Sequence, residues 1–177
     1  ESGDKRELAA ALNGLAQLHR VEGELDAAEP LYDRVVRLAR ESGDSEAIAI
    51  GLLNLALVSI GRGTGDRARP MLIEVVTIAL EIGSRPVGQS ALDVSAGYGA
   101  WLGEWECAAR FFGAADAQAV EIGLQRDPTD ESFLMPLIDR ARVELGAEGF
   151  ALAERAGRAL TYEQSVGEAR AWLARAP

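Results

Sequence analysis

The stretch GRGTGDRARP, residues 61–70, places glycines at positions 61, 63 and 65 ahead of a run of charged residues. Glycine-rich loops of this kind either cradle a phosphate group or form the turn between two helices. A phosphate-binding loop has the pattern GxxxxGK followed by Ser or Thr, between a strand and a helix, and this stretch contains no lysine. The neighbouring sequence favours a turn between two helices, because Gly63 recurs forty residues away in both directions, as Gly23 and Gly103.

A period of forty residues runs through the first 123 residues. Six columns are identical in three copies without a gap: Ala16/Ala56/Ala96, Gly23/Gly63/Gly103, Ala28/Ala68/Ala108, Ala39/Ala79/Ala119, Glu41/Glu81/Glu121 and Gly43/Gly83/Gly123. A repeat of this length is typical of solenoids, in which each unit buries its apolar face against its neighbours. GRGTGDRARP is therefore predicted to be the hairpin turn of the second repeat.

Each repeat predicts two helices. Apolar residues three and four apart indicate helices over residues 5–21 and 25–42, then 46–61 and 65–82, then 86–102 and 105–122. Gly23 ends the first helix and Gly43 the second, the latter as a left-handed residue after the last turn. On the first helix one apolar face is expected, formed by Leu8, Ala11, Leu12, Leu15, Ala16 and Leu18. The sequence ESGD occurs at residues 1–4 and again at 41–44, so we expect the chain to be a segment of a longer array.

The period stops after Gly123. The polar stretch LQRDPTDES, residues 124–132, predicts a linker, followed by helices over 131–145 and 147–158 with a hinge at Gly146. Thr161 and Gln164 form a capping-box signal for a last helix ending at residue 174. End units of solenoids differ from the others because they cover the last open face. The predicted fold is all-α: an α-solenoid of helical hairpins over residues 1–123 and a C-terminal helical cap over 124–177, together one continuous domain.

Composition and charge exclude several classes of partner. The 177-residue chain is 48% hydrophobic but has no apolar run near the roughly 20 residues that a membrane span needs. Its formal net charge of −10, without a cluster of Lys and Arg, argues against direct nucleic-acid binding by this segment. The single cysteine, Cys107, excludes an internal disulfide and a multi-cysteine metal site, and it favours a cytoplasmic location.

The hairpins resemble tetratricopeptide repeats lengthened from the usual length of about 34 residues to forty. The shared positions are the small residue at Ala16, Ala56 and Ala96, the turn glycine at Gly23, Gly63 and Gly103, and the second-helix alanine at Ala28, Ala68 and Ala108. The aromatic residue one turn later is present as Tyr32 and Phe112 but is Leu72 in the middle copy, and the family's terminal proline is missing.

Two stretches near the C-terminus carry a narrower resemblance. AARFFGAADAQAVEIG (108–123) and GFALAERAGRALTYEQSVGEA (149–169) are similar to the C-terminal end of large bacterial signalling ATPases, common in actinobacteria. The resemblance implies a nucleotide-binding switch domain in the parent protein, with a LuxR-type DNA-binding domain or a nucleotide cyclase domain elsewhere in it. It also implies that the repeats sense an inducer or a partner protein and relay its occupancy to the ATPase.

No arrangement of side chains predicts catalysis. The only histidine, His19, aligns with a serine and a glycine in the other copies, and Cys107 aligns with an alanine and an arginine, so the repeat requires neither. Acid–base and nucleophilic sites need polar groups that converge in a pocket, whereas the clustered carboxylates stand in turns. We therefore predict that the chain is not an enzyme and holds no cofactor and no metal.

The concave face of the repeats is the predicted binding site. The resemblance implies that it is lined by first-helix positions: Asn13, Gln17 and Arg20 in the first copy, Leu53, Leu57 and Ile60 in the second, and Asp93, Gly97 and Trp101 in the third. The lysine and asparagine that clamp a peptide carboxylate in chaperone-binding relatives are absent. An apolar middle with polar ends favours an amphipathic helix of a protein or peptide partner, or a small effector. Two alternatives are that the cap helices fill the groove, or that a second copy of the chain does, which would make the protein a self-association scaffold.

Overall fold

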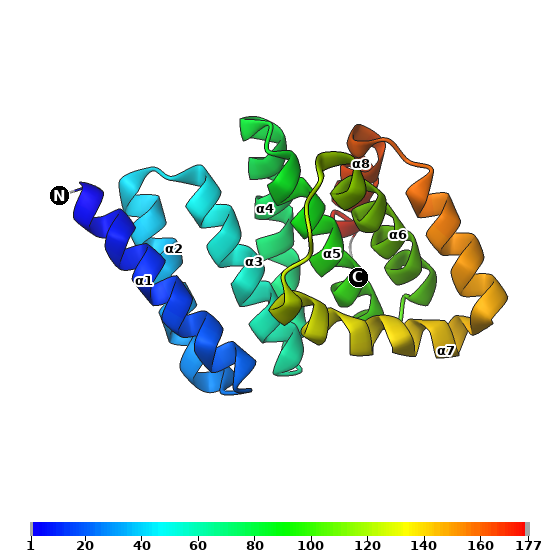
Figure 1. The fold of residues 1–177 in the computed structure, drawn as a ribbon, viewed down its shortest axis with the longest axis horizontal. Helices are drawn as coiled ribbons and strands as arrows, with labels where there is room; N and C mark the ends of the chain where they lie inside the picture. The colour runs from blue at the N-terminus through cyan, green and yellow to red at the C-terminus, as the bar shows by residue number, and fades with distance from the viewer. Residues whose placement is uncertain (1, 176–177) are drawn as a thin grey trace. The chain divides into compact units, whose positions relative to one another are not determined.

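The computed structural model describes residues 2–175, and within them it contains α-helices, one short 3₁₀ turn and no strand. The all-α prediction is thereby confirmed. The helices are shown in Figure 1 and are α1 (Ser2–Val21), α2 (Leu25–Ser42), α3 (Ser45–Gly61), α4 (Ala68–Ile82), α5 (Arg85–Leu102), α6 (Trp105–Ile122), α7 (Pro128–Arg158) and α8 (Tyr162–Leu173).

A glycine in the left-handed region follows each of the first six helices. Gly23, Gly43, Gly63, Gly83, Gly103 and Gly123 have φ values between 66° and 78°. At the end of α2 the N–H of Gly43 donates to the carbonyl oxygen of Arg40, and the N–H of Asp44 donates to that of Ala39. Other residues rarely adopt this conformation, which is why glycine marks the period. GRGTGDRARP is thus confirmed as the turn between α3 and α4.

The fourth helix and the linker differ from the prediction. Residues 65–67 form a separate 3₁₀ turn, η1 (Gly65–Arg67), so α4 begins only at Ala68. The linker is shorter than expected, because Asp127 caps α7 by accepting a hydrogen bond from the Thr129 N–H and Pro128 opens the helix. The hinge at Gly146, with φ 70° and ψ 161°, and the capping box at Thr161 are confirmed.

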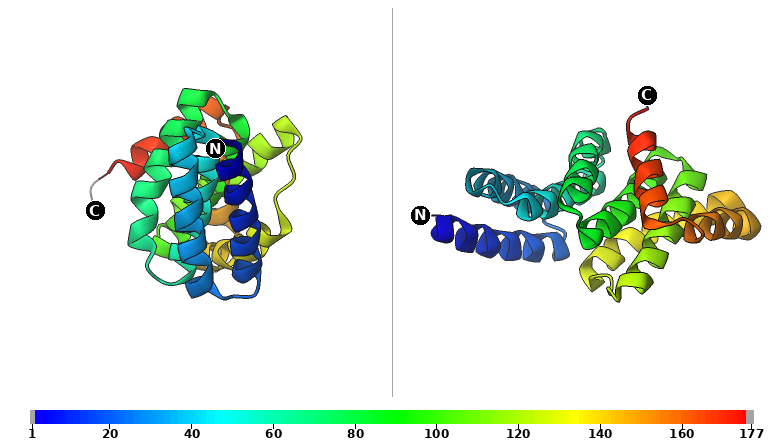
Figure 2. Two further views of the ribbon diagram at one scale, coloured as in Figure 1. Left: turned by 90° about the vertical axis from the view of Figure 1, so that its left-hand side faces the viewer. Right: turned by 90° about the horizontal axis from the view of Figure 1, so that it is seen from above.

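The chain divides into two compact units, Glu1–Ile82 and Gly83–Pro177, called unit 1 and unit 2. Unit 1 consists of the hairpins α1/α2 and α3/α4, and α2 also packs against α3. Figure 2 shows α1 and α2 side by side in both views. Its fully buried side chains include Ala16, Ala28, Tyr32, Leu72, Val75 and Val76.

The apolar face expected on α1 is only partly covered. Ala16 is fully buried and Leu12 is half-buried, but Leu8, Leu15 and Leu18 are 40%, 45% and 53% exposed. The buried positions of α1 are Ala9, Ala16 and Arg20, which lie on a different side of the helix from the three leucines. The repeat pattern therefore identified the helix but not which of its apolar residues are buried.

Unit 2 combines the third hairpin, α5/α6, with α7 and α8. The Trp172 ring of α8 lies 5.1 Å from that of Phe111 and 5.7 Å from that of Tyr98, measured between centroids, and its Nε1 donates to Glu104. One apolar face of α8 is buried in full, formed by Val166, Ala169, Trp172 and Leu173. α8 thus covers apolar surface of the third hairpin.

The second half of α7 approaches α6 closely at two glycines. A Cβ placed on Gly157 would lie 2.8 Å from the carbonyl carbon of Arg110 and closer still to its oxygen. A Cβ on Gly113 would similarly collide with the backbone of Glu154. Because backbone atoms on both sides form this contact, it leaves no room for any side chain at either position.

Candidate partner-binding groove

A cavity of about 290 Å³ lies in unit 1 between α1, α2 and the beginning of α3. Residues three and four apart on α1 share one face and form one wall, and the C-terminal half of α2 contributes apolar and small side chains. The lining residues are Arg6, Ala9, Ala10 and Asn13 from α1, Val35, Ala39 and Ser42 from α2, Asp44 before α3, and Ala47 and Ile50 from α3. Most of this lining is apolar.

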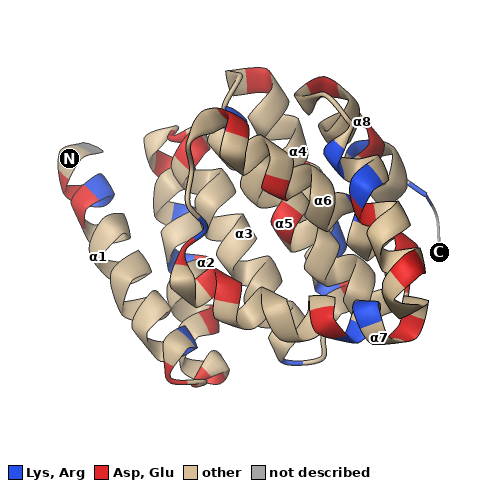
Figure 3. Ribbon diagram, turned by 45° about the vertical axis from the view of Figure 1, so that its right-hand side comes forward, with Lys and Arg blue, Asp and Glu red and all other residues tan. Residues whose placement is uncertain are grey.

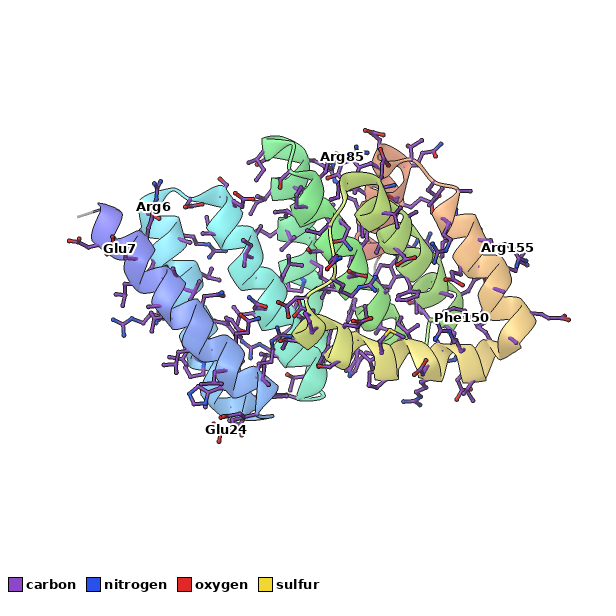
Figure 4. The ribbon with its side chains drawn as sticks, viewed as in Figure 1. Arg6, Glu7, Glu24, Arg85, Phe150 and Arg155 are labelled. Carbon is purple, nitrogen blue, oxygen red and sulfur yellow. The ribbon has the colours of Figure 1, made fainter. Side chains whose placement is uncertain are left out.

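Polar pairs stand at two places along the cavity. Arg6 Nε lies 3.6 Å from Asp44 Oδ2, at the end of α1 that Figure 4 shows beside the α2–α3 turn. Asp44 is held in place as the N-cap of α3, where its side chain accepts a hydrogen bond of 3.0 Å from the Ala47 N–H. Two turns farther along α1, Asn54 Nδ2 donates to Asn13 Oδ1 at 3.2 Å. The cavity therefore combines an apolar floor with an ion pair and an amide pair.

Among the residues predicted to line the concave face, Asn13 lines this cavity. Gln17 and Arg20 follow along α1 at the same spacing, with Gln17 half-buried and Arg20 buried. On α3 all three predicted residues are buried, namely Leu53, Leu57 and Ile60. The structure brings Asn13 together with residues that precede it on α1, so the cavity lies nearer the start of the helix than predicted.

Apart from Asn13, sequence reasoning missed the residues that line the cavity, among them Arg6, Ala10, Asp44 and Ile50. The spacing of Arg6, Ala10 and Asn13 continues the three- and four-residue steps of Asn13, Gln17 and Arg20 in the other direction, so that signal was present. Nothing in the sequence indicated that α1 and α3 leave an opening above α2 at this point.

The predicted residues of the third copy lie on α5 in unit 2, and part of the chain itself covers two of them. The Asp93 carboxylate, on a residue 9% exposed, accepts hydrogen bonds of 2.9 and 2.8 Å from Nε and Nη2 of Arg126, which precedes α7. Gln89 Nε2 donates to the same carboxylate at 2.8 Å. A Cβ on Gly97 would lie 3.3 Å from Leu134 of α7.

Trp101 differs from these two residues. It is half-buried, and its ring stacks on Tyr98 with 6.0 Å between centroids. At this end of α5 the predicted groove residue is thus partly accessible, whereas at Asp93 and Gly97 the cap occupies the face.

Burial raises the pKa of the Asp93 carboxyl group, and the hydrogen bonds and charge of Arg126 oppose that rise. The chemistry is that of a buried structural ion pair, in which each partner compensates the desolvation of the other. Asp93 is therefore positioned to hold the segment before α7 against α5.

One group of side chains has ligand spacing for a metal ion. His19, Glu22 and Glu24 lie at the turn between α1 and α2, each with one potential ligand atom within 4.8 Å of the others. His19 Nδ1 lies 2.6 Å from Glu24 Oε2, so these two side chains already satisfy each other. Both glutamates are exposed, and exposed carboxylates commonly occur without an ion.

The Cys107 thiol is held in its unreactive form. Burial raises its pKa to about 11, and the charge of Glu104 adds to the shift. A thiol reacts as the thiolate, and at about pH 8 a pKa of about 11 leaves only about one molecule in a thousand ionised. We expect a chromogenic disulfide reagent to modify Cys107 at least about a hundredfold more slowly in the native chain than in the urea-unfolded chain. Equal rates in the two states would contradict this protection.

Comparison with known proteins identifies the repeats of unit 1. Residues 7–81, which cover most of α1 to α4, match the tetratricopeptide repeat family. Searches of the curated proteins and of the solved structures gave no significant match.

These repeats generally mediate protein–protein interactions, and the family is typically non-catalytic. Among the helices that the structure describes, none is long and apolar enough to cross a membrane. Residues 7–81 are therefore tetratricopeptide-like repeats within an all-α helical-repeat fold.

Proposed function

We propose that this chain is a non-enzymatic protein-interaction module that binds a peptide or helical segment of a partner protein, or a small effector, in the groove of unit 1. The observation that carries the proposal is the cavity between α1, α2 and α3 in repeats of an interaction family. Its volume, about 290 Å³, is at the lower end of the range of about 300–1,000 Å³ for ligand pockets. That volume suits one or two apolar side chains of a partner.

The polar pairs would orient such a ligand. The amides of Asn13 and Asn54 can each donate and accept a hydrogen bond, which matches the needs of a peptide backbone. The apolar floor supplied by Val35, Ala39 and Ile50 would bury the side chain that anchors the partner. Gln17, which is half-buried, would extend the contact along α1.

The resemblance to bacterial signalling ATPases supports a finer version of this proposal. A ligand in the groove would bias an ATPase switch elsewhere in a cytoplasmic multidomain regulator, provided that it binds one state of the switch more tightly than the other. This version depends on the resemblance of residues 108–123 and 149–169, and on no contact within the groove.

Filling the cavity tests the proposal directly. Ala10 lines the cavity and is exposed, so Ala10→Trp blocks the site without burying a new group in the core. Peptides selected against the full chain by display are expected to bind this variant at least about tenfold more weakly. Ala171→Trp is the matched control, because Ala171 is an exposed alanine on α8 of unit 2, and it should leave binding unchanged. A library without binders, or binders that tolerate Ala10→Trp, would refute the groove as the partner site.

The exposed leucines of α1 favour self-association as a second candidate function. Leu8, Leu15 and Leu18 offer apolar area that pairing with another copy of the chain would bury. Light scattering tests this candidate by the mass in solution. A mass of one chain at every concentration would exclude it.

A further inference from the structure

A second surface, on the other side of α1 from the cavity, has the features of a binding site. Asp4, Leu8, Ala11, Leu15, Leu18 and Glu22 follow one another at steps of four and three residues and lie in one line, the outer face of α1. The three leucines and Ala11 are exposed. Residues 8–18 contain no charged side chain, which Figure 3 shows as an uncharged middle of α1 between charged ends.

The forty-residue period shows what covers the equivalent line on α3. The residues that correspond to Leu8, Ala11, Leu15 and Leu18 are Ile48, Gly51, Leu55 and Val58. Gly51, Leu55 and Val58 are buried, and a Cβ on Gly51 would lie 2.7 Å from Val36 of α2. The occupant of this line on α3 is thus the second helix of the preceding hairpin. The outer face of α1 has the same residue spacing as this line on α3, so a helix equivalent to α2 can pack on it in the same way.

The charges at the two ends specify the occupant further. On α3 the end of the line is Arg62, which forms ion pairs with Asp26 and Glu29 of α2. The equivalent residue on α1 is Glu22, of opposite sign, while Asp4 corresponds to Asp44. Both ends of the outer face are therefore acidic, so a complementary helix must carry a basic residue at each end of its apolar face.

The same charges oppose self-association through this face, so they count against the second candidate function, which only the exposed leucines favour. In an antiparallel pair of α1 helices, Asp4 of each copy would stand opposite Glu22 of the other. In a parallel pair each carboxylate would meet its own equivalent. Either arrangement brings like charges together at both ends of the contact, which costs binding free energy.

We propose that the outer face of α1 binds an amphipathic α-helix that is the second helix of a further helical hairpin and carries a basic residue at each end of its apolar face. The apolar contact line of that helix has the chemistry of Val35 and Val36 on α2, which pack over Gly51. This site is separate from the proposed groove, because its residues do not line the cavity.

The probe is a peptide with the sequence of α2, residues 25–42, carrying the changes D26R and E29R. Its C-terminal half already contains a basic residue, Arg40, which the bridge described next leaves unchanged. A lactam bridge between Asp33 and a lysine replacing Arg37, both exposed positions of α2, keeps the peptide helical, so that weak binding does not reflect an unfolded peptide. The control peptide carries the same bridge without the two charge changes. The full chain should bind the changed peptide about tenfold more tightly than the control at low salt.

Variants of the chain locate the contact. Leu15→Asp is expected to weaken binding of the changed peptide at least about tenfold, and because Leu15 is exposed the variant should remain folded, which circular dichroism checks. Leu152→Asp changes an exposed leucine on α7 in unit 2 and should have no effect. Glu22→Arg should reduce or reverse the preference between the two peptides, a result that a merely apolar patch would not give.

Three results would overturn the proposal. The first is an absence of saturable binding by the changed peptide. The second is binding that Leu15→Asp leaves unaltered. The third is dimerisation of the chain through the same face, seen by light scattering as a mass of two copies that Leu15→Asp returns to one. None of these results involves the cavity that Ala10→Trp fills, so the groove and the outer face of α1 are tested independently.

Discussion

Replacement of Gly157 by alanine is expected to lower the free energy of unfolding by at least about 3 kcal/mol. The added Cβ would lie 2.8 Å from the carbonyl carbon of Arg110 and 3.0 Å from the backbone nitrogen of Ala114. These are backbone atoms of α6, which cannot rotate away as a flexible side chain does. The second half of α7 would have to separate from α6, and urea unfolding followed by circular dichroism measures the loss.

Gly167→Ala is the matched control for this prediction. Gly167 lies in α8 of the same unit, and a Cβ there would meet nothing within 4 Å. The same chemical change should therefore raise stability by about 0.5–1 kcal/mol, because alanine loses less conformational freedom than glycine in a helix. Equal stability of the Gly157→Ala and Gly167→Ala variants would show that α6 and α7 are not in such close contact.

The second large effect is expected at the buried pair of Asp93 and Arg126. Asp93→Ala leaves the Arg126 guanidinium, whose side chain is 13% exposed, without its carboxylate. Removal of one partner from a buried ion pair costs about 3–5 kcal/mol, so urea unfolding should show a loss of about 3 kcal/mol at neutral pH. Because arginine stays charged at every working pH, the guanidinium left by Asp93→Ala has no protonation change that could relieve its burial.

Arg126→Met should behave differently, because the carboxyl group that it leaves behind can take up a proton. Burial already raises the pKa of Asp93 against the opposing effect of Arg126, and the substitution removes that opposition. A raised pKa means that the folded chain holds the proton more tightly than the unfolded chain, whose value is about 3.9, so stability is lost as the pH rises. The cost of Arg126→Met should therefore grow as the pH rises above about 4, the unfolded-state pKa of the carboxyl group.

An exposed ion pair provides the comparison. Asp139 and Arg142 are paired at 2.8 Å on α7 with exposed side chains, and Asp139→Ala should change stability by at most about 0.5 kcal/mol. A cost of Arg126→Met that does not depend on pH, or that matches the effect of Asp139→Ala, would contradict the buried-pair account of Asp93.

The sequence predicted those parts of the fold that depend on local chemistry. The left-handed turns at Gly23, Gly43 and Gly63 need glycine, so their spacing gave the helix boundaries to within three residues. The hinge at Gly146 and the capping box at Thr161 likewise depend only on residues close together in the sequence. The exposed leucines of α1 were not predictable in this way, because burial depends on which side of a helix its neighbours occupy.

The candidate site was predicted less well for the same reason. Asn13 lines the cavity, but the opening depends on how α1, α2 and α3 diverge, which no residue type encodes locally. The cover over Asp93 and Gly97 joins residues of α5 to Arg126 and Leu134, more than thirty positions later in the chain. That pairing brings together the repeat and a segment outside its period, so the repeat pattern contained no signal for it.

The even spacing of the left-handed glycines restricts how such a chain can change length. From Gly23 to Gly123 they stand twenty residues apart. Because each residue turns an α-helix by about 100°, an insertion or deletion of one residue inside a helix would rotate every later side chain of that helix away from its neighbour. A whole block of forty residues can be gained or lost without such a rotation, and the recurrence of ESGD at residues 1–4 and 41–44 supplies a matching junction. Natural variants that differ in length are thus expected to differ by complete hairpins, or by residues added in the turns.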